Sequence, residues 1–376
     1  MQLQQLLWTA PAHWQVVDGD LDKPAQLVLY FAAPGVMTDG RRLGELRERF
    51  SKARIIGCTT GGEILGNQVH DNSLVATAIA FDDAQIRVAS RNSATRDASF
   101  RIGAEIAAEL AGSGLKGLFV LSDGTMVNGS ELVRGLKSAM TDGVVLTGGL
   151  AGDGDTFGST LVGADVAPTP GTVLGIGFYG DKLTFRHGSF GGWDAFGPER
   201  LVTRSEDNVL YELDGEPALD LYERYLGDEA CHLPGSALLF PLRIRAPHDL
   251  GTDLVRTVVG IDKTSRAMIF AGDVPVGYSA QLMRGNFDHL VEGAARAARQ
   301  AAATGGGALA ILISCIGRKL LLGQRIDEEV ETVCDVLGGQ VRTIGFYSYG
   351  EICPHDFTAS CELHNQTMTI TLIDEA

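Results

Sequence analysis

The stretch GCTTGGEI, residues 57–64, returns nearly three hundred residues later as GFYSYGEI, residues 345–352. Both segments read G-x-x-[ST]-x-G-E-I, and both follow a short apolar run. Each is followed by another apolar segment that begins beside an asparagine, DNSLVATAIAF (71–81) or HNQTMTITLI (364–373). Such self-similarity indicates an internal duplication. The sequence therefore predicts two related mixed α/β halves in one chain.

Three β-α-β units are predicted from the hydrophobic periodicity. Continuous apolar runs predict buried strands, whereas apolar residues three and four positions apart predict helices. The strand, helix and strand are expected at 27–32, 39–50 and 53–58, at 115–123, 130–140 and 143–149, and at 308–315, 325–337 and 341–348. Each unit ends in a glycine-rich turn. We therefore expect an α/β fold with sheets flanked by helices.

The length of the chain predicts more than one domain. A chain of 376 residues exceeds the usual size of a single hydrophobic core. Alternating, aromatic-rich stretches between residues 172 and 213 suggest antiparallel strands, and a helix is expected at 217–226. We place the domain boundary after residue 214, so that the domains are residues 1–214 and 215–376, with the ligand cleft between them.

Charge and hydropathy exclude two classes of partner. A formal net charge of −16 argues against nucleic acid and anionic membranes, because both are held largely by Lys and Arg. No signal or transit peptide is recognisable, and the best apolar run, residues 308–317, is too short to span a bilayer. The six cysteines form no C-x-x-C pair and are expected to be reduced thiols. We therefore expect a cytoplasmic protein without membrane insertion.

The familiar catalytic and cofactor motifs do not account for the chain. Residues 175–180, GIGFYG, fit G-x-G-x-x-G, but the next residues alternate like a strand instead of opening a helix. There is no P-loop, HExxH, GxSxG or EF-hand sequence. Because no set of nucleophile, base and orienting residue is recognisable either, we expect that the protein is not an enzyme.

The repeated turns carry the candidate ligand-binding residues. Glycines after a strand let backbone N–H groups approach a ligand, and carboxylates there lie where open α/β sheets bind ligands. The candidates are Gly61, Gly62, Glu63, Asp153, Arg318, Tyr349, Gly350 and Glu351. In the alternative, the glycines only make the turns, each glutamate accepts nearby backbone N–H groups, and Arg318 pairs with the Glu-rich helix. Both alternatives remain open on the sequence alone.

With these motifs in view, the chain resembles the FIST family over nearly its full length, with a FIST N-terminal and a FIST C-terminal domain. The resemblance rests on segments that occur in family order. They are GCTTGGEI, LSDGTMVNGSEL, LTGGLAGDGDTF, GPERLVTRSEDNVLYELDGEPALDLYERY, SCIGRKLLLGQRIDEEVE, GFYSYGEI and HNQT. The family is regarded as sensory, so the resemblance implies a small-molecule ligand and a partner that is a histidine kinase or a cyclic-di-GMP enzyme.

A stand-alone FIST chain of this length is most similar to NosP-type sensors. That resemblance implies haem as a cofactor, nitric oxide as the signal and a separately encoded histidine kinase as the regulated partner. The alternative is a haem-free FIST sensor for a metabolite such as an amino acid, held by Glu63, Glu351 and Arg318. A homo-oligomer is compatible with either function.

Haem would require an axial ligand, and three residues are the candidates. Cys353 precedes a proline, as in haem-regulated proteins, and His355 adjoins it in the segment EICPHD. His187 is the third candidate. A lone His or Cys is more often structural, and we interpret His364 as structural first. Trp193 and Phe196 could stack on a flat ligand, although a core role is the commoner one.

Overall fold

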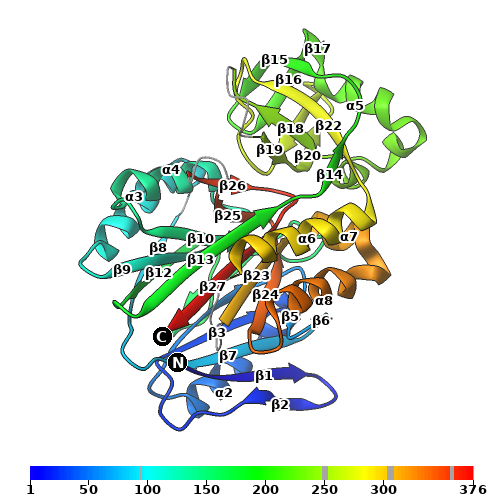
Figure 1. The fold of residues 1–376 in the computed structure, drawn as a ribbon. Coiled ribbons are helices and arrows are strands. Elements are labelled where there is room, and N and C mark those ends of the chain that lie inside the picture. Colours follow the sequence, from blue (N-terminus) through cyan, green and yellow to red (C-terminus); the bar gives the residue numbers. More distant parts are fainter. Residues whose placement is uncertain (94, 248–252, 303–308, 356–359, 376) are drawn as a thin grey trace.

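The structure, a computed structural model, describes residues 1–93, 95–247, 253–302, 309–355 and 360–375. It consists of an α/β body and a smaller lobe of strands, which lies above the body in Figure 1. The lobe comprises residues 193–285 and is called the inserted lobe, because the chain leaves the body after β13 (Leu183–Phe190) and returns to it at α6 (Phe287–Ala301). The described residues include no helix long and apolar enough to cross a membrane.

The body is built from three units with the same order of strands. In each unit a first and a second strand pair in parallel, a returning strand pairs antiparallel with the first, and an opening strand pairs with the returning one. In the first unit the opening, first, second and returning strands are β1 (Gln2–Thr9), β3 (Leu27–Ala32), β4 (Arg54–Thr59) and β7 (Leu74–Ala80). In the second unit they are β8 (Gln85–Asn92), β9 (Leu115–Ser122), β10 (Val145–Leu150) and β12 (Thr172–Tyr179). In the third unit they are β13, β23 (Leu309–Cys315), β24 (Arg342–Ser348) and β27 (Met368–Glu375).

The units exchange strands in a closed circle. After its second strand, each unit sends a short strand to pair antiparallel with the second strand of another unit. These exchanged strands are β5 (Glu63–Leu65), which pairs with β24; β25 (Gly350–Pro354), which pairs with β10; and β11 (Val162–Ala164), which pairs with β4. The edge strands β2 (His13–Gly19), β6 (Gln68–His70) and β26 (Cys361–His364) extend the sheets. No unit therefore completes its sheet from its own residues.

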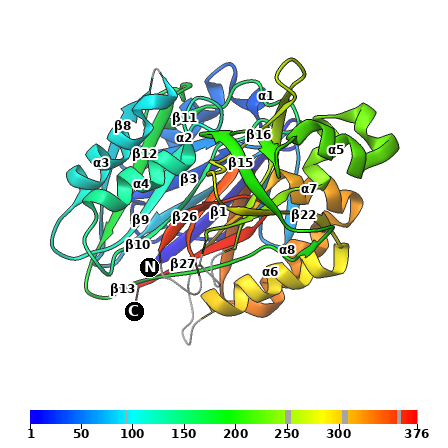
Figure 2. The ribbon, with the colours of Figure 1, turned by 90° about the horizontal axis from the view of Figure 1, so that it is seen from above.

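Helices cover the outer faces of the body, as Figure 2 shows for α3 and α4 on one side and α6, α7 and α8 on the other. Their bounds are α1 (Pro34–Met37), α2 (Arg41–Arg49), α3 (Ser99–Leu110), α4 (Gly129–Ala139), α7 (Ile316–Leu322) and α8 (Ile326–Leu337). The Asn128 side chain accepts the backbone N–H groups of Ser130 and Glu131 at the start of α4, which satisfies two donors that the helix leaves unpaired.

The predicted fold class is confirmed, because the chain is an α/β protein of related halves. The same order of strands occurs not twice but three times, once in each unit of the body. The nine predicted strands and helices of the β-α-β units are present, and no end differs by more than two residues. Residue 308, the predicted start of β23, lies outside the described residues. Residues 175–179 are part of β12, which agrees with the rejection of the dinucleotide-binding motif at 175–180. The boundary at residue 214 stays a prediction; strands from both sides of it share sheets.

The inserted lobe is a curved antiparallel sheet packed around α5 (Ala218–Leu226). Its strands are β14 (Trp193–Ala195), β15 (Arg200–Glu206), β16 (Val209–Leu213), β17 (Glu216–Pro217), β18 (Leu242–Arg245), β19 (Asp253–Arg256), β20 (Val258–Asp262), β21 (Ala267–Phe270) and β22 (Ser279–Gly285). The lobe has its own apolar cluster, in which Tyr222 of α5 is fully buried. It is therefore a separate packing unit joined to the body through β14 and β22.

The three units share one apolar core. Phe31, Leu121 and Ile313 hold equivalent positions near the ends of the three first strands, and all three are fully buried in one cluster. The rings of Phe31 and Phe346 lie 4.6 Å apart, which joins the first and third units. Burial of each such side chain stabilises the fold by roughly 1.5–3 kcal/mol. The same burial explains why the first strands are apolar on both faces.

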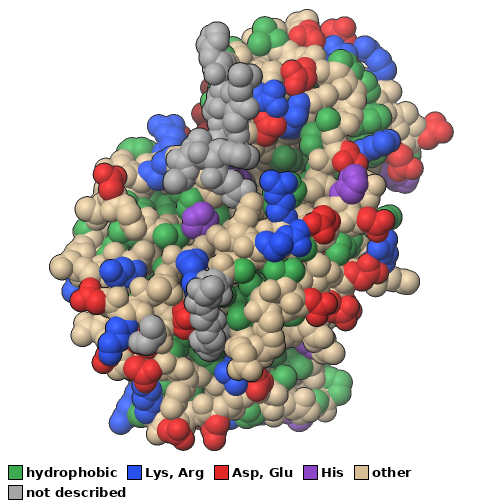
Figure 3. Space-filling view, viewed as in Figure 1, with side chains coloured by type: hydrophobic (Ala, Val, Ile, Leu, Met, Phe, Trp, Pro, Cys, Tyr) green, Lys and Arg blue, Asp and Glu red, His purple; other side chains and the backbone are tan. Residues whose placement is uncertain are grey.

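Charges of both signs alternate over the face shown in Figure 3, where blue and red side chains are interspersed. No broad basic surface is visible on that face. The two chain ends lie close together in Figure 1, and the amino group of Met1 is 3.6 Å from a carboxylate oxygen of Glu375. The third unit therefore closes against the start of the first.

Candidate functional site

Three backbone hydrogen bonds close a ring where the glycine-rich turns meet. They run from Gly61 N to Tyr347 O (2.8 Å), from Gly152 N to Thr59 O (3.0 Å) and from Tyr349 N to Leu150 O (3.2 Å). Each unit donates one of these bonds and accepts another, and its donor residue stands two positions after its acceptor residue. The three bonds are therefore equivalent. A Cβ atom at Gly61 would lie 2.6 Å from the Ile316 side chain, so glycine fits this crowded position. The repeated turns thus form the centre of the body.

The two glutamates of the repeated motif hold the turns. Glu63 accepts the hydroxyl hydrogen of Thr60 and both the N–H (3.2 Å) and the hydroxyl (2.6 Å) of Ser73. Glu351 is held in the same way, by the hydroxyl of Ser348 and by the N–H and hydroxyl of Thr367. This arrangement is the turn-holding alternative considered from the sequence.

Neither glutamate is open to a ligand in this conformation. Glu63 and Glu351 have no exposed surface. Burial raises the pKa of Glu63 to about 7 and that of Glu351 to about 8, while their hydrogen-bond donors act in the opposite direction. Contact of either carboxylate with a ligand stays a prediction, and it would require the surrounding chain to move.

Arg318 forms a buried salt bridge. Its Nε atom donates to Glu329 of α8 at 2.7 Å, and Nη2 donates to the carbonyl oxygen of Leu290 at 2.8 Å. Arg318 and Glu329 both have fully buried side chains. The other Glu329 oxygen accepts the hydroxyls of Ser314 and Tyr347. The guanidinium thus joins α7, α8 and the start of α6, and it lines neither of the two cavities described below.

The remaining candidates of the turns are Asp153, Tyr349, Gly62 and Gly350, and each has its own contacts. Tyr349 donates its hydroxyl hydrogen to Asp153, and the hydroxyl oxygen accepts the N–H of Phe157 at 3.1 Å. The Nζ atom of Lys319 covers Gly62, where a Cβ atom would lie 2.3 Å from it. Gly350 opens β25 beside Leu363. The structure therefore brings Asp153 and Tyr349 together by a hydrogen bond, whereas Arg318 pairs with Glu329.

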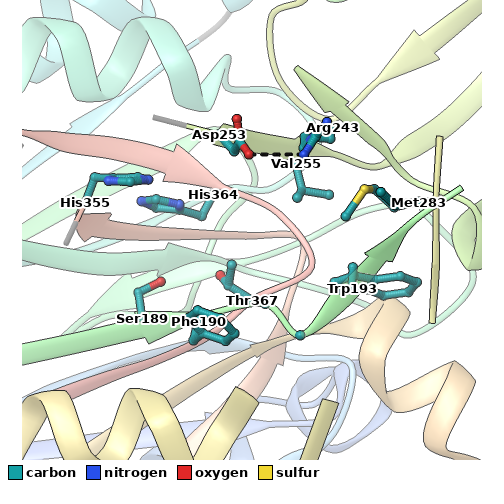
Figure 4. A pocket seen from close by; sticks show the side chains of 13 residues that line it. Ser189, Phe190, Trp193, Arg243, Asp253, Val255, Met283, His355, His364 and Thr367 are labelled. Carbon is teal, nitrogen blue, oxygen red and sulfur yellow. Dashed lines mark hydrogen bonds and ion pairs between the residues drawn. The ribbon is translucent and has the colours of Figure 1, made fainter. Parts of the chain in front are cut away.

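A pocket of about 340 Å³ lies between the body and the inserted lobe, and we call it the lobe pocket. Its volume falls in the range of roughly 300–1,000 Å³ that is usual for small-molecule sites. Figure 4 shows Phe190 and Trp193 on one side, His355 and His364 on another, and Arg243, Val255 and Met283 on strands of the lobe. The complete lining is Ser189, Phe190, Gly191, Gly192, Trp193, Ala195, Arg243, Asp253, Val255, Met283, His355, His364 and Thr367.

Two imidazole rings line the lobe pocket side by side. His355 and His364 have ring centroids 6.0 Å apart and an interplanar angle of 21°. The Nε2 atom of His364 is 3.0 Å from the carbonyl oxygen of Cys353, which can only accept, so Nε2 carries the proton. Burial lowers the pKa of His364 to about 4, so the ring is neutral near pH 7 and Nδ1 keeps its lone pair.

The three candidate haem ligands divide between the pocket and its surroundings. His355 lines the lobe pocket, whereas Cys353 is fully buried in β25 with its Sγ atom 3.7 Å from Nδ1 of His187. His364, which we interpret from the sequence as structural first, also lines the lobe pocket. The hairpin of β25 and β26 brings it beside His355, and the available signal was the pair of histidines nine residues apart after the second copy of the repeated motif. Among the described residues, no three His, Cys, Asp or Glu side chains group to hold a bare metal ion.

Aromatic and charged groups complete the lobe pocket. Trp193 is 9% exposed and donates its indole N–H to the carbonyl oxygen of Gln366 at 2.8 Å. Phe196 instead packs inside the lobe against Tyr225. Arg243 pairs with Glu199 at 2.7 Å and with Asp253 at 3.4 Å. The pocket therefore combines an apolar wall, a neutral imidazole, a cation and an anion.

Two comparisons with known proteins bear on this arrangement. Residues 26–216 match the profile of the FIST N domain, and residues 218–354 match the profile of the FIST C domain. The first match alone covers more than half of the chain. No curated protein matches the sequence.

Proposed function

Because the chain belongs to the FIST family, whose domains are the sensory ligand-binding domains of signalling proteins, we propose that it is a cytoplasmic sensor, not an enzyme. We propose further that its ligand occupies the lobe pocket and that this ligand is haem, with nitric oxide as the signal. The regulated partner in this proposal is a separate histidine kinase; a cyclic-di-GMP enzyme is the alternative partner.

The observation that carries the haem proposal is the state of His364. Its Nε2–H is fixed by a backbone carbonyl, and its Nδ1 atom keeps a lone pair at neutral pH. Metal-binding histidines are commonly held in this way, with the second ring nitrogen donating to a carbonyl or carboxylate. His355 beside it offers a second imidazole in the same pocket.

The other residues of the lobe pocket fit the remaining parts of haem. Phe190, Trp193, Val255 and Met283 form an apolar wall for a flat macrocycle, and Arg243 is the cation suited to a propionate. A bound haem would supply the iron that takes up nitric oxide. The protein would hold the ring, present an imidazole and exclude water.

Signal transmission can follow from the position of the pocket. Its walls come from the body and from the inserted lobe, so a change in its occupant favours some lobe positions over others. A kinase that binds one of these positions would then respond to the ligand. The corresponding test measures autophosphorylation of the kinase with and without ligand-loaded protein.

The visible absorption spectrum tests the haem. We expect a Soret band at one haem per chain and a ferrous nitrosyl spectrum after nitric oxide is added. His364→Ala and His355→Ala should lower the haem content, whereas His289→Ala, an exposed histidine paired with Asp194, is the matched control. Loose, non-stoichiometric haem without a nitrosyl spectrum would contradict haem binding.

One observation favours an alternative ligand, an amino acid. Arg243 and Asp253 both line the lobe pocket, and together they complement a carboxylate and an ammonium group. A thermal-shift screen of amino acids tests this candidate, since a ligand that binds only the folded state raises the melting temperature. Stabilisation that is lost in Arg243→Gln would support it, and no shift with any amino acid would contradict it.

A further inference from the structure

A second cavity, of about 150 Å³, lies at the carboxyl ends of β9 and β10, and we call it the turn cavity. The carboxyl edge of parallel strands is where α/β sheets usually bind ligands. Its lining comes from both parts of the molecule: Arg96, Gly124, Thr125, Phe157 and Tyr349 from the body, and Val259 and Ala271 from the inserted lobe. It shares no lining residue with the lobe pocket.

The turn cavity lies where the second unit departs from the other two. The positions of Thr60 and Glu63 in the first unit, and of Ser348 and Glu351 in the third, are occupied by Ala151 and Gly154 in the second. The second unit therefore lacks a glutamate at this position, and the fully buried Asp123 instead accepts the N–H of Gly171, the residue just before its returning strand, at 3.0 Å. Residues 153–161 form a longer loop before the exchanged strand β11 begins, and this loop supplies one wall of the cavity.

The wall of the turn cavity is held in a strained conformation. Phe157 has a φ of 50°, which is unusual for a bulky residue other than glycine. It is fixed by the hydrogen bond from its N–H to the Tyr349 hydroxyl and by its ring, which stacks on Tyr349 at 4.6 Å and 19°. Backbone strain of this kind is often found at ligand sites. The stacked rings of Phe157 and Tyr349 give the cavity a flat aromatic lining.

The size and charge of the turn cavity indicate the class of ligand. A dry cavity of about 150 Å³ in another protein takes up benzene, so a single ring fits this volume. Arg96 on the lining is exposed and makes no ion pair with any described residue. An arginine at the edge of an aromatic cavity suits a carboxylate. We propose that the turn cavity binds a small organic acid, with a benzene-sized apolar group against Phe157 and Tyr349 and its carboxylate at Arg96.

Benzoate and the neutral benzyl alcohol are the probes for this site. Isothermal titration calorimetry of the full chain should show saturable binding of benzoate and weaker binding of benzyl alcohol. Arg96→Gln should weaken benzoate about tenfold and leave benzyl alcohol unchanged within twofold. The control is Arg47→Gln, which removes an exposed charge on α2 and should leave both affinities unchanged.

Filling the cavity provides the second test. Ala271→Leu, or Val259→Leu if the first variant melts at a much lower temperature, should abolish binding of both probes. Benzoate binding that is unchanged in both filling variants would overturn the proposal, as would equal weakening by Arg96→Gln and Arg47→Gln. Failure of benzoate to saturate would also overturn it. None of these results affects haem binding in the lobe pocket, because the two sites have separate linings.

Discussion

Glu63 and Glu351 occupy equivalent positions in two units and are held by the same three kinds of donor: a hydroxyl three residues earlier, and the N–H and hydroxyl of the residue just before the returning strand. The repeated G-x-x-[ST]-x-G-E-I motif thus encodes a buried carboxylate that fastens a turn. An asparagine stands near each of these residues: Asn72 directly precedes Ser73, and Asn365 lies two positions before Thr367.

Stability should fall as the pH rises from about 6 to about 8.5. The folded protein holds protons on Glu63 and Glu351, with pKa values of about 7 and 8, whereas the unfolded chain has lost them above its ordinary pKa of about 4.5. The unfolding free energy should therefore decrease by on the order of 3 kcal/mol over this range. Urea unfolding of Glu63→Gln/Glu351→Gln should show a much flatter dependence. An equal slope in both proteins would contradict the assignment.

Breaking the buried salt bridge should be costly. Arg318→Met leaves Glu329 as a buried unpaired carboxylate, so we expect a loss of about 3–5 kcal/mol in unfolding free energy. The double variant Arg318→Met/Glu329→Leu should lose less than the sum of the two single variants. Arg325→Met removes one partner of an exposed pair with Glu328 and should change stability far less. Equal effects at both arginines would contradict a buried pair.

The glycine at the entrance to the inserted lobe should tolerate no side chain. Gly192 has a φ of 87°, and a Cβ atom there would lie 2.2 Å from the carbonyl oxygen of His289. Gly192→Ala should lower the unfolding free energy by about 2 kcal/mol or more. Gly44→Ala, inside α2 with open space around it, should instead raise it by about 1 kcal/mol. Thermal unfolding of both variants measures the contrast.

Removing one hydroxyl should loosen the loop of the second unit. Tyr349→Phe leaves the stacked ring in place but removes the hydrogen bonds to Asp153, Gly154 and Phe157. We expect a loss of about 1–3 kcal/mol and faster hydrogen exchange at the Phe157 amide. Unchanged exchange at this amide would show that the hydroxyl does not hold the loop.

Thiol reagents should distinguish one cysteine from the rest. Cys231 is exposed, whereas burial raises the pKa of the Cys58, Cys315 and Cys361 thiols. At neutral pH we expect rapid modification of one thiol in the native protein, located by peptide mass spectrometry, and loss of that reaction in Cys231→Ser. Rapid modification of Cys58 in the native protein would contradict the buried core of the first unit.

The β-α-β units could be predicted because their strands are buried on both faces and so read as continuous apolar runs, such as Leu27–Ala32. The exchange of strands could not be predicted, because a three-residue strand such as β5 carries no periodicity that names its partner. The repeated turns were recognised, but whether Glu63 faces a ligand or the interior depends on packing. The lobe pocket was missed because distant strands assemble it, and of its lining residues only Trp193, His355 and His364 had been weighed, the last as structural first.

The circular exchange of strands affects how the protein folds while it is being synthesised on the ribosome. β5 begins at residue 63, but its partner β24 begins only at residue 342, which is 279 positions later in the chain. At about 5–20 residues per second, the first unit must wait on the order of tens of seconds for that partner. During the first part of this interval, until β11 is synthesised from residue 162 on, the edge of β4 that receives β11 is open as well. The nascent chain is therefore a natural client for chaperones until its last unit emerges.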